Sequence, residues 1–178
     1  MNPQILDMII YKEFETERLL ITPTIEQDAI LIYEMMNSPK FIKYVGNRNI
    51  GSVEEARKYI LDKMIPQLKN YGYSNYTITR KSDNVKVGIC GLYDRDGVKG
   101  IDIGFGLLPK YEGKGYAFES ANRLKEAAIN EFDITIINAI TSKQNIASQK
   151  LLEKLGLACV GTTMLPHESE ELLLYKIT

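Results

Sequence analysis

The stretch from residue 101 to residue 141 restricts the fold of this chain more than any other part of it. An apolar run of strand-forming residues (101–108) is followed by a loop with two glycines, a helical repeat (about 116–130) and a second β-branched run (134–141). A strand–helix–strand crossover of this length brings the second strand back parallel to the first, since no short turn is available to reverse the chain. The sequence therefore predicts a parallel strand pair.

Antiparallel structure is predicted on both sides of this crossover. Alternating apolar residues separated by short polar turns indicate a meander of strands at 73–80, 85–93 and 101–108. A capping-box pattern at Ser52 and Glu55 predicts the start of a helix. The other expected elements are a strand at 17–22, helices from about 26, at 41–44 and from 145 to 155, and a strand hairpin at 158–164 and 171–177.

These elements predict one domain of the α+β, or mixed α/β, class. At ~100–200 residues per domain, a chain of 178 residues is one domain. We expect that domain to span residues 1–178, with 1–15 as an N-terminal extension. Its central sheet should be mixed, mostly antiparallel, and flanked by about four helices.

Composition excludes several classes of function. The net charge of −1 argues against a nucleic-acid binder, which is normally strongly basic. The longest apolar stretches are far shorter than the ~20 residues that span a bilayer. No segment joins a basic region to an apolar run and a small-residue cleavage site. We therefore expect a soluble cytoplasmic protein that uses neither nucleic acid nor membrane as a partner.

The supply of metal ligands is small. His167 is the only histidine, and the two cysteines, Cys90 and Cys159, lie far apart without a C-x-x-C pattern. Zinc sites need several such ligands at short spacing. The sequence predicts a protein without a metal, and it excludes zinc hydrolases of the H-E-x-x-H type.

The loop at 110–117 is the candidate for binding a ligand. Gly113 and Gly115 allow positive φ and close approach of a ligand, and the N–H groups at the start of the following helix favour an anion such as a pyrophosphate. The alternative is a tight turn that needs glycine for its geometry alone. The sequence contains no G-x-x-x-x-G-K-[ST] motif, and Pro109 interrupts any G-x-G-x-x-G pattern from Gly104. The sequence therefore contains no motif that would indicate ATP or dinucleotide binding.

Two segments in this order resemble the GCN5-related N-acetyltransferase (GNAT) superfamily, namely Ile101 to Ala117 and Asn145 to Leu157. The Thr16-Glu17-Arg18-Leu19-Leu20-Ile21 start resembles the branch that contains ribosomal-protein N-terminal acetyltransferases. The resemblance implies a GNAT-like domain whose parallel strands splay apart where the cofactor enters. It also implies acetyl-CoA as cosubstrate and an amine as acceptor.

The resemblance carries the cofactor assignments. The family pattern Gln/Arg-x-x-Gly-x-Gly/Ala matches at Gly113 and Gly115, with Lys110 in the first position. It implies that backbone N–H groups hold the pyrophosphate and that the end of the preceding strand bonds the pantetheine amides. The residues expected at the cofactor are Gly106, Leu107, Leu108, Glu112, Gly113, Lys114, Gly115, Tyr116, Ala117 and Asn145.

The second motif resembles Asn-x-x-Ala/Ser-x-x-Leu-Tyr-x-x-x-Gly-Phe. Asn145, Ser148 and Gly156 match it, whereas Leu152 stands where the family has a tyrosine that often protonates the departing thiolate. Ser148 is the substitute that the ribosomal-protein branch suggests. The structural alternatives are an ordinary helix N-cap for Asn145 and an exposed helix serine for Ser148.

The general base has several candidates. Asp102 matches the family position where an acidic residue often acts as base, with a solvent-facing strand residue as the alternative. Glu168, Glu170 and Glu171 form a charged run that could serve instead, and we expect His167 to be exposed in a hairpin loop and uninvolved. A buried strand cysteine is the commoner reading of Cys90, so direct transfer is favoured over an acetyl-cysteine.

The acceptor is expected to be a primary amine. An α-amine with a pKa near 7.8 is roughly one-seventh neutral at pH 7, and a lysine near 10.4 only about 1 in 2,500. A protein N-terminal α-amine therefore needs less help. The alternatives are a small amine (a polyamine, amino acid or aminoglycoside) and a non-catalytic acyl-CoA-binding sensor. The chain is expected to act as a monomer or homodimer.

Overall fold

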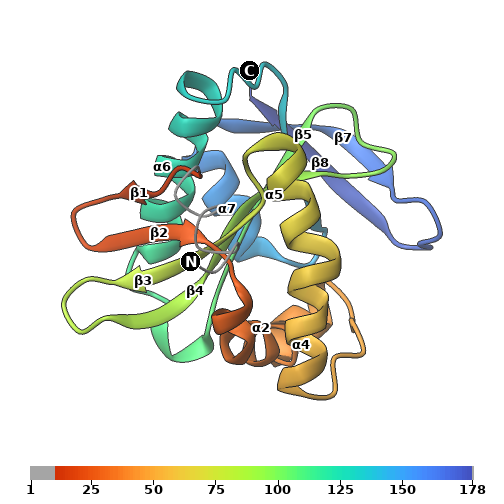
Figure 1. Ribbon diagram of the computed structural model, residues 1–178. Helices are drawn as coiled ribbons and strands as arrows, with labels where there is room; N and C mark the ends of the chain where they lie inside the picture. The colour runs from red at the N-terminus through yellow and green to blue at the C-terminus, as the bar shows by residue number, and fades with distance from the viewer. Residues whose placement is uncertain (1–10, 178) are drawn as a thin grey trace.

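One eight-stranded sheet forms the centre of the computed structural model, which describes residues 11–177 (Figure 1). Its order is β1-β2-β3-β4-β5-β6-β8-β7. Only β5 and β6 pair in parallel among the described strands. This arrangement confirms the predicted sheet. The strands are β1 (Phe14–Glu15), β2 (Leu19–Pro23), β3 (Asn75–Arg80), β4 (Val85–Asp94), β5 (Ile101–Leu107), β6 (Ile137–Ser142), β7 (Leu157–Met164) and β8 (Glu171–Ile177).

Helices cover both faces of this sheet. The described part of the chain has five helical bodies, where about four were expected, when α4, the π turn and α5 are counted as one continuous helix. The helices are η1 (Glu26–Asp28), α2 (Ala29–Met36), α3 (Pro39–Tyr44), α4 (Val53–Tyr59), the π turn η2 (Ile60–Met64), α5 (Ile65–Tyr71), η3 (Pro109–Tyr111), α6 (Tyr116–Asn130) and α7 (Ile146–Lys154).

The π turn explains how the long helix passes Pro66. Proline donates no N–H, and in a regular α-helix its ring clashes with the carbonyl four residues earlier. The wider turn lies directly before Pro66, so the helix continues to Tyr71 and ends at Gly72, whose φ is +82°. The predicted cap also forms, with the Ser52 hydroxyl accepting the Glu55 N–H at 3.1 Å.

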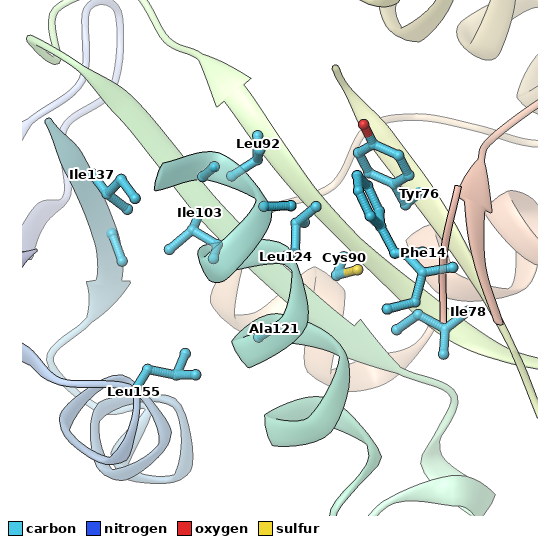
Figure 2. Packing of buried hydrophobic residues seen from close by; sticks show 14 of the residues in the cluster. Phe14, Tyr76, Ile78, Cys90, Leu92, Ile103, Ala121, Leu124, Ile137 and Leu155 are labelled. Carbon is cyan, nitrogen blue, oxygen red and sulfur yellow. The ribbon is translucent and has the colours of Figure 1, made fainter. Parts of the chain in front are cut away.

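Two hydrophobic clusters fill the space between the sheet and its helices. The first joins the sheet to α6 and α7 (Figure 2; labelled residues Phe14, Tyr76, Ile78, Cys90, Leu92, Ile103, Ala121, Leu124, Ile137 and Leu155). The second packs α2 and the α4–α5 helix against the other face, with Ile32, Ile60 and Ile89 among its members. The sheet is therefore a middle layer between two helical layers.

A β-bulge in β4 sets which side chains face each layer. The register between β3 and β4 shifts between Ile78 and Thr79, so one residue of β4 is left over. Val87 and Cys90, three residues apart, consequently face the same cluster, while Ile89 faces the other. The bulge lies beside the part of β5 that the next section describes.

The start of β6 differs from the sequence-based expectation. β6 begins at Ile137 rather than 134, because residues 133–136 lead out of α6 with Asp133 at φ +53°. Residues 1–10 of the expected N-terminal extension lie outside the described residues. Phe14, within the extension, forms part of β1 and packs on Tyr76 at 5.7 Å between ring centroids.

In the described residues, no helix combines the length and apolar character needed to cross a membrane.

Candidate active site

The two parallel strands separate soon after they meet. β5 and β6 pair only at Ile101–Ile137 and Asp102–Asn138, although β5 continues to Leu107 and β6 to Ser142. Beyond Asp102 their facing edges diverge. A gap at the carboxyl ends of parallel strands is where open α/β sheets commonly bind ligands. The sheet is thus open at the point that the resemblance implies.

Asp102 lies at the start of this gap. One carboxylate oxygen accepts the Ile140 N–H at 3.2 Å, and the other accepts the Arg95 Nε–H at 2.8 Å. The side chain is 3% exposed, so the alternative of a solvent-facing strand residue is excluded. Burial raises the pKa of Asp102 above its ordinary value, and the attraction of Arg95 limits that rise. Asp102 satisfies an N–H of β6 that the strand separation would otherwise leave unpaired.

A cavity of about 480 Å³, called here the first cavity, brings most of the predicted cofactor residues together. It runs between the end of β5, the 112–115 loop, the starts of α6 and α7, and α3. Its walls include Gly106, Leu107, Glu112, Gly113, Gly115, Ala117, Asn145 and Ser148. Leu108, Lys114 and Tyr116 do not line it.

The glycine loop presents unused N–H groups to the first cavity. Gly113 has φ +74° and Gly115, the N-cap of α6, has φ +83°. In the described part of the chain the N–H groups from Gly113 to Phe118 have no hydrogen-bond acceptor. A run of free donors at the positive end of a 15-residue helix is an anion site. A Cβ at Gly113 would meet nothing within 4 Å, so the space beside it is open.

Two of the predicted cofactor residues have main-chain groups already in use. The Leu108 N–H donates to Val87 O at 2.9 Å, and its carbonyl accepts the Tyr111 N–H at 2.9 Å. Glu112 N–H donates to Pro109 O at 3.3 Å. Leu108 is also 7% exposed and packs in the second hydrophobic cluster. Gly106 lies two residues before Leu108 and in register with Ile89, so it too turns its main-chain groups to β4, and Leu107 is the better placed residue for bonding an extended ligand along the open edge of β5.

The Thr16–Arg18 start of the chain anchors the glycine loop. Thr16 Oγ1 and Arg18 N–H both donate to Glu119 Oε1, at 2.5 and 2.9 Å. Arg18 also pairs with Glu119 Oε2 at 2.7 Å and donates to Lys114 O at 2.9 Å. Burial alone would raise the pKa of Glu119, but these hydrogen bonds hold it below its ordinary value. The sequence pattern at 16–21 thus has a structural role at the first turn of α6.

A second cavity, of about 340 Å³, meets the first. It is lined by α2, α3, the α4–α5 helix, β3 to β6, the start of α7 and the β7–β8 loop. Asp102 and Arg95 line this second cavity but not the first. Both cavities are lined by Met35, Phe41, Tyr44, Val45, Phe105, Gly106, Asn145 and Ser148. Two ligands bound in these cavities would therefore meet beside Ser148.

Ser148 lies in the first turn of α7. Asn145 caps this helix, its side-chain oxygen accepting the Ser148 N–H at 3.3 Å, so the N-cap expected from the sequence forms. Ser148 itself is half-buried rather than exposed, and within the described residues its hydroxyl has no hydrogen-bond partner. That hydroxyl is available to a ligand at the junction of the cavities.

The other residues considered for catalysis differ in burial and in their position relative to the cavities. Leu152, at the family's tyrosine position, is 1% exposed. Burial raises the pKa of Cys90 to about 12, which makes its thiol a poor nucleophile and agrees with the reading of a buried strand cysteine. His167 is exposed in the β7–β8 loop, as expected. Glu168 and Glu170 line the second cavity, whereas Glu171 pairs with Lys143 at 3.4 Å.

Sequence reasoning missed several residues that line the second cavity. Arg95, the partner of Asp102, comes from the β4–β5 turn, and Arg48 and Lys63 come from the helical half of the chain. No local motif marks them, because the fold alone brings them to one place. Among the described residues, no cluster of three or more His, Cys, Asp or Glu side chains is arranged to hold a metal.

Comparison with known proteins identifies the family to which this chain belongs. A family model described as the acetyltransferase (GNAT) domain matches residues 18–158, and the chain belongs to that family. It is 30% identical over 148 residues to the uncharacterized N-acetyltransferase p20 of Bacillus licheniformis, with 82% of each chain covered. The predicted family and the predicted N-acetyltransferase class are confirmed.

Solved structures share the fold. A GNAT-family acetyltransferase from Bacillus anthracis has a TM-score of 0.75 and 26% identity, covering 93% of this chain and 98% of its own. The ribosomal L7/L12 α-N-protein acetyltransferase RimL in complex with coenzyme A has a TM-score of 0.78 and 18% identity, covering 93% and 97%. At 18% identity the likeness to RimL concerns the fold alone.

Proposed function

We propose that this protein transfers the acetyl group of acetyl-CoA directly to the α-amine of an acceptor, within a complex that holds both substrates. The observation that carries the proposal is the meeting of the two cavities at Ser148. The first cavity ends in free N–H donors suited to a pyrophosphate, and the second contains the carboxylate of Asp102. Acetyl-CoA supplies the activated acetyl group.

The first cavity fits the cosubstrate by the chemistry of its donors. The free N–H groups from Gly113 to Ala117 would bind the two phosphates, Leu107 on the open edge of β5 would bond a pantetheine amide, and Gly106 would line the path of the pantetheine. Asn145 contributes by capping α7 and lining the wall. RimL, which shares the fold, is itself recorded with coenzyme A.

Asp102 is the proposed base. Arg95 keeps its carboxylate ionised, while burial raises its pKa toward the range in which a carboxylate accepts a proton more readily. The acceptor amine loses its proton to Asp102, directly or through one water molecule. The neutral amine then attacks the acetyl carbonyl, and the C–S bond breaks after the C–N bond forms.

Ser148 is the proposed partner of the departing thiolate. Its hydroxyl lies at the cavity junction on the first turn of α7, where the helix dipole favours negative charge. A thiolate with a pKa near 8.5 leaves without a strong acid, so a hydrogen bond from a serine is sufficient. The buried Leu152 cannot take this role.

Initial-rate kinetics test this function. We expect thiol release that depends on both acetyl-CoA and an α-amine, with intersecting double-reciprocal lines. Parallel lines would contradict direct transfer and indicate an acetyl-enzyme. Tight acetyl-CoA binding without thiol release toward peptides, amino acids, polyamines or aminoglycosides would instead identify a non-catalytic acyl-CoA-binding protein.

A further inference from the structure

The charged side chains that line the second cavity form two groups. The members of one group have partners inside the protein: Asp102 pairs with Arg95 at 2.8 Å, and Asp94 accepts the Tyr71 hydroxyl at 2.9 Å. The other group is Arg48, Lys63, Glu168 and Glu170. In the part of the chain that the structure describes, these four have neither an ion-pair partner nor a side-chain hydrogen bond.

The four unpaired charges belong to the second cavity alone, since none of them lines the first. They therefore face the acceptor and not the cosubstrate. Two are cations and two are carboxylates, so a ligand of single charge would be attracted by one pair and repelled by the other.

The carboxylates lie on the α7 side of the cavity. Glu170 stands two residues before Leu172, which pairs with Ser142 at the end of β6. Ser142 is followed three residues later by Asn145, the cap of α7. The loop that carries Glu168 and Glu170 thus leads into the start of β8, which pairs with the end of β6 shortly before α7, the helix that holds Ser148.

The cations come from a different wall. Arg48 lies in the loop between α3 and α4, and Lys63 lies in the π turn between α4 and α5. Figure 1 shows these walls as separate parts of the fold, the long α4–α5 helix and the β7–β8 hairpin. The residue next to Lys63, Met64, is buried in the second hydrophobic cluster and lines the same cavity, so the position of this wall is fixed by packing.

We propose that the acceptor is a dipolar amine: a primary amine that carries a carboxylate on the same small molecule or peptide end. This inference rests on the proposed function. The amine lies toward Glu168, Glu170 and Ser148, and the carboxylate lies toward Arg48 and Lys63. A free acidic amino acid and a peptide with an acidic second residue share this chemistry.

The arrangement also assists binding and orientation of the acceptor. Carboxylates at the mouth attract the ammonium form, which predominates at neutral pH. Once it is bound, Glu168 and Glu170 favour the ammonium form, so Asp102 has to remove its proton before the attack, while the cations of the opposite wall lie away from the amine. The acceptor's carboxylate pairs with those cations. An amine without a carboxylate would leave Arg48 and Lys63 without a counter-charge and would bind less well.

Matched acceptors test the proposal with the full-length protein. The pairs are Ser-Asp-Ala-Ala amide with Ser-Asn-Ala-Ala amide, and aspartate with its diamide. We expect a kcat/KM about 10-fold or more higher for the anionic member of at least one pair, a preference worth about 1.4 kcal/mol. The pair that shows it identifies the source, peptide or free amino acid.

Variants test whether Arg48 and Lys63 cause the preference for the anionic acceptor. Arg48→Gln with Lys63→Gln should remove the preference while acetyl-CoA affinity stays unchanged, because neither residue lines the first cavity. Lys58→Gln is the matched control: Lys58 lies on the same long helix, pairs with Asp62 and lines neither cavity. It should keep the preference.

The possible results distinguish a failure of the dipolar-acceptor inference from a failure of the proposed acetyltransferase function. Turnover of all amines with no preference for the anionic member would overturn the dipolar acceptor and leave the acetyltransferase intact. A preference that survives in the double variant would also overturn it. Absence of thiol release with every acceptor would instead overturn the proposed function.

Discussion

The two cavities that meet at Ser148 are built in different ways. The anion-binding end of the first cavity comes from one short stretch, in which β5, the glycine loop and the start of α6 follow one another within residues 101–118. The second cavity draws on α2 to α5, on β3 to β6, on α7 and on the β7–β8 loop. Local motifs can therefore define the cofactor side, whereas the acceptor side exists only once the chain has folded.

This difference predicts that the two sides can be damaged separately. The largest effect is expected at Asp102, on the acceptor side. Asp102→Asn should lower kcat/KM by roughly 10²–10⁴-fold at neutral pH, since that is the typical contribution of a general base. Calorimetry should show acetyl-CoA affinity unchanged, because Asp102 does not line the first cavity.

The pH profile separates catalysis by Asp102 from its structural role. Burial raises the pKa of the Asp102 carboxyl, so the acid limb of kcat/KM should lie above the ordinary pKa of aspartate and disappear in Asp102→Asn. Activity of the variant should recover in part as the pH rises and the amine becomes neutral. A loss of equal size at every pH would show that Asp102 acts only by holding Ile140 and Arg95.

The second prediction concerns the cofactor side. Gly113→Asp should weaken acetyl-CoA binding by about 100-fold or more, because a carboxylate repels pyrophosphate and each hydrogen bond to a charged group contributes about 1.5–3 kcal/mol. Gly72→Asp is the control, since Gly72 has a similar φ of +82° and likewise open space around its Cβ position. Equal affinity of both variants by calorimetry would remove the glycine loop from the cofactor site.

The sequence predicted the local structure around the first cavity well because its determinants are short-range. The bounds of α6 follow from a glycine N-cap and an apolar stripe, and the cap of α7 follows from Asn145. The parallel pairing of β5 with β6 follows from the length of the crossover. Each of these features depends on residues that are close in sequence.

The acceptor side was predicted poorly because its contacts are long-range. Nothing near Arg95 in the sequence marks it as the partner of a buried carboxylate, so the sequence left open whether Asp102 faces solvent. The bulge at Val87, which decides the faces of β4, has no glycine or proline signal at its own position. Packing between distant elements fixes both features.

The junction of the cavities gives the third prediction. Ser148→Ala should lower kcat by roughly 10- to 150-fold, the range for a hydrogen bond of about 1.5–3 kcal/mol to a developing thiolate. Affinity for acetyl-CoA and KM for the acceptor should change little, because binding on either side is intact. Single-turnover rates at saturating acetyl-CoA measure the step, and a wild-type rate would leave Ser148 with a structural role alone.

The prediction with the smallest expected effect tests whether the glycine loop depends on contacts with residues that are distant in the sequence. Glu119→Gln should lower acetyl-CoA affinity only several-fold and reduce the free energy of unfolding by about 1 kcal/mol, because it weakens hydrogen bonds from Thr16 and Arg18 that anchor the first turn of α6. The glycine loop keeps its own N–H groups, so binding persists. Chemical denaturation and calorimetry provide the two measurements.

The sign of the pH dependence follows from the Glu119 pKa, which the folded protein holds below its ordinary value. The stabilisation from Glu119 is therefore present above the unfolded-state pKa and is lost as the pH falls through the folded-state value. Glu131→Gln is the matched control: its carboxylate pairs with Arg123 at the far end of α6, and its pKa is also lowered. Both variants should lose stability, but only Glu119→Gln should weaken acetyl-CoA binding, because only Glu119 ties the N-terminal strand region to the loop. Equal affinity in the two variants would show that the loop holds its shape without this long-range anchor.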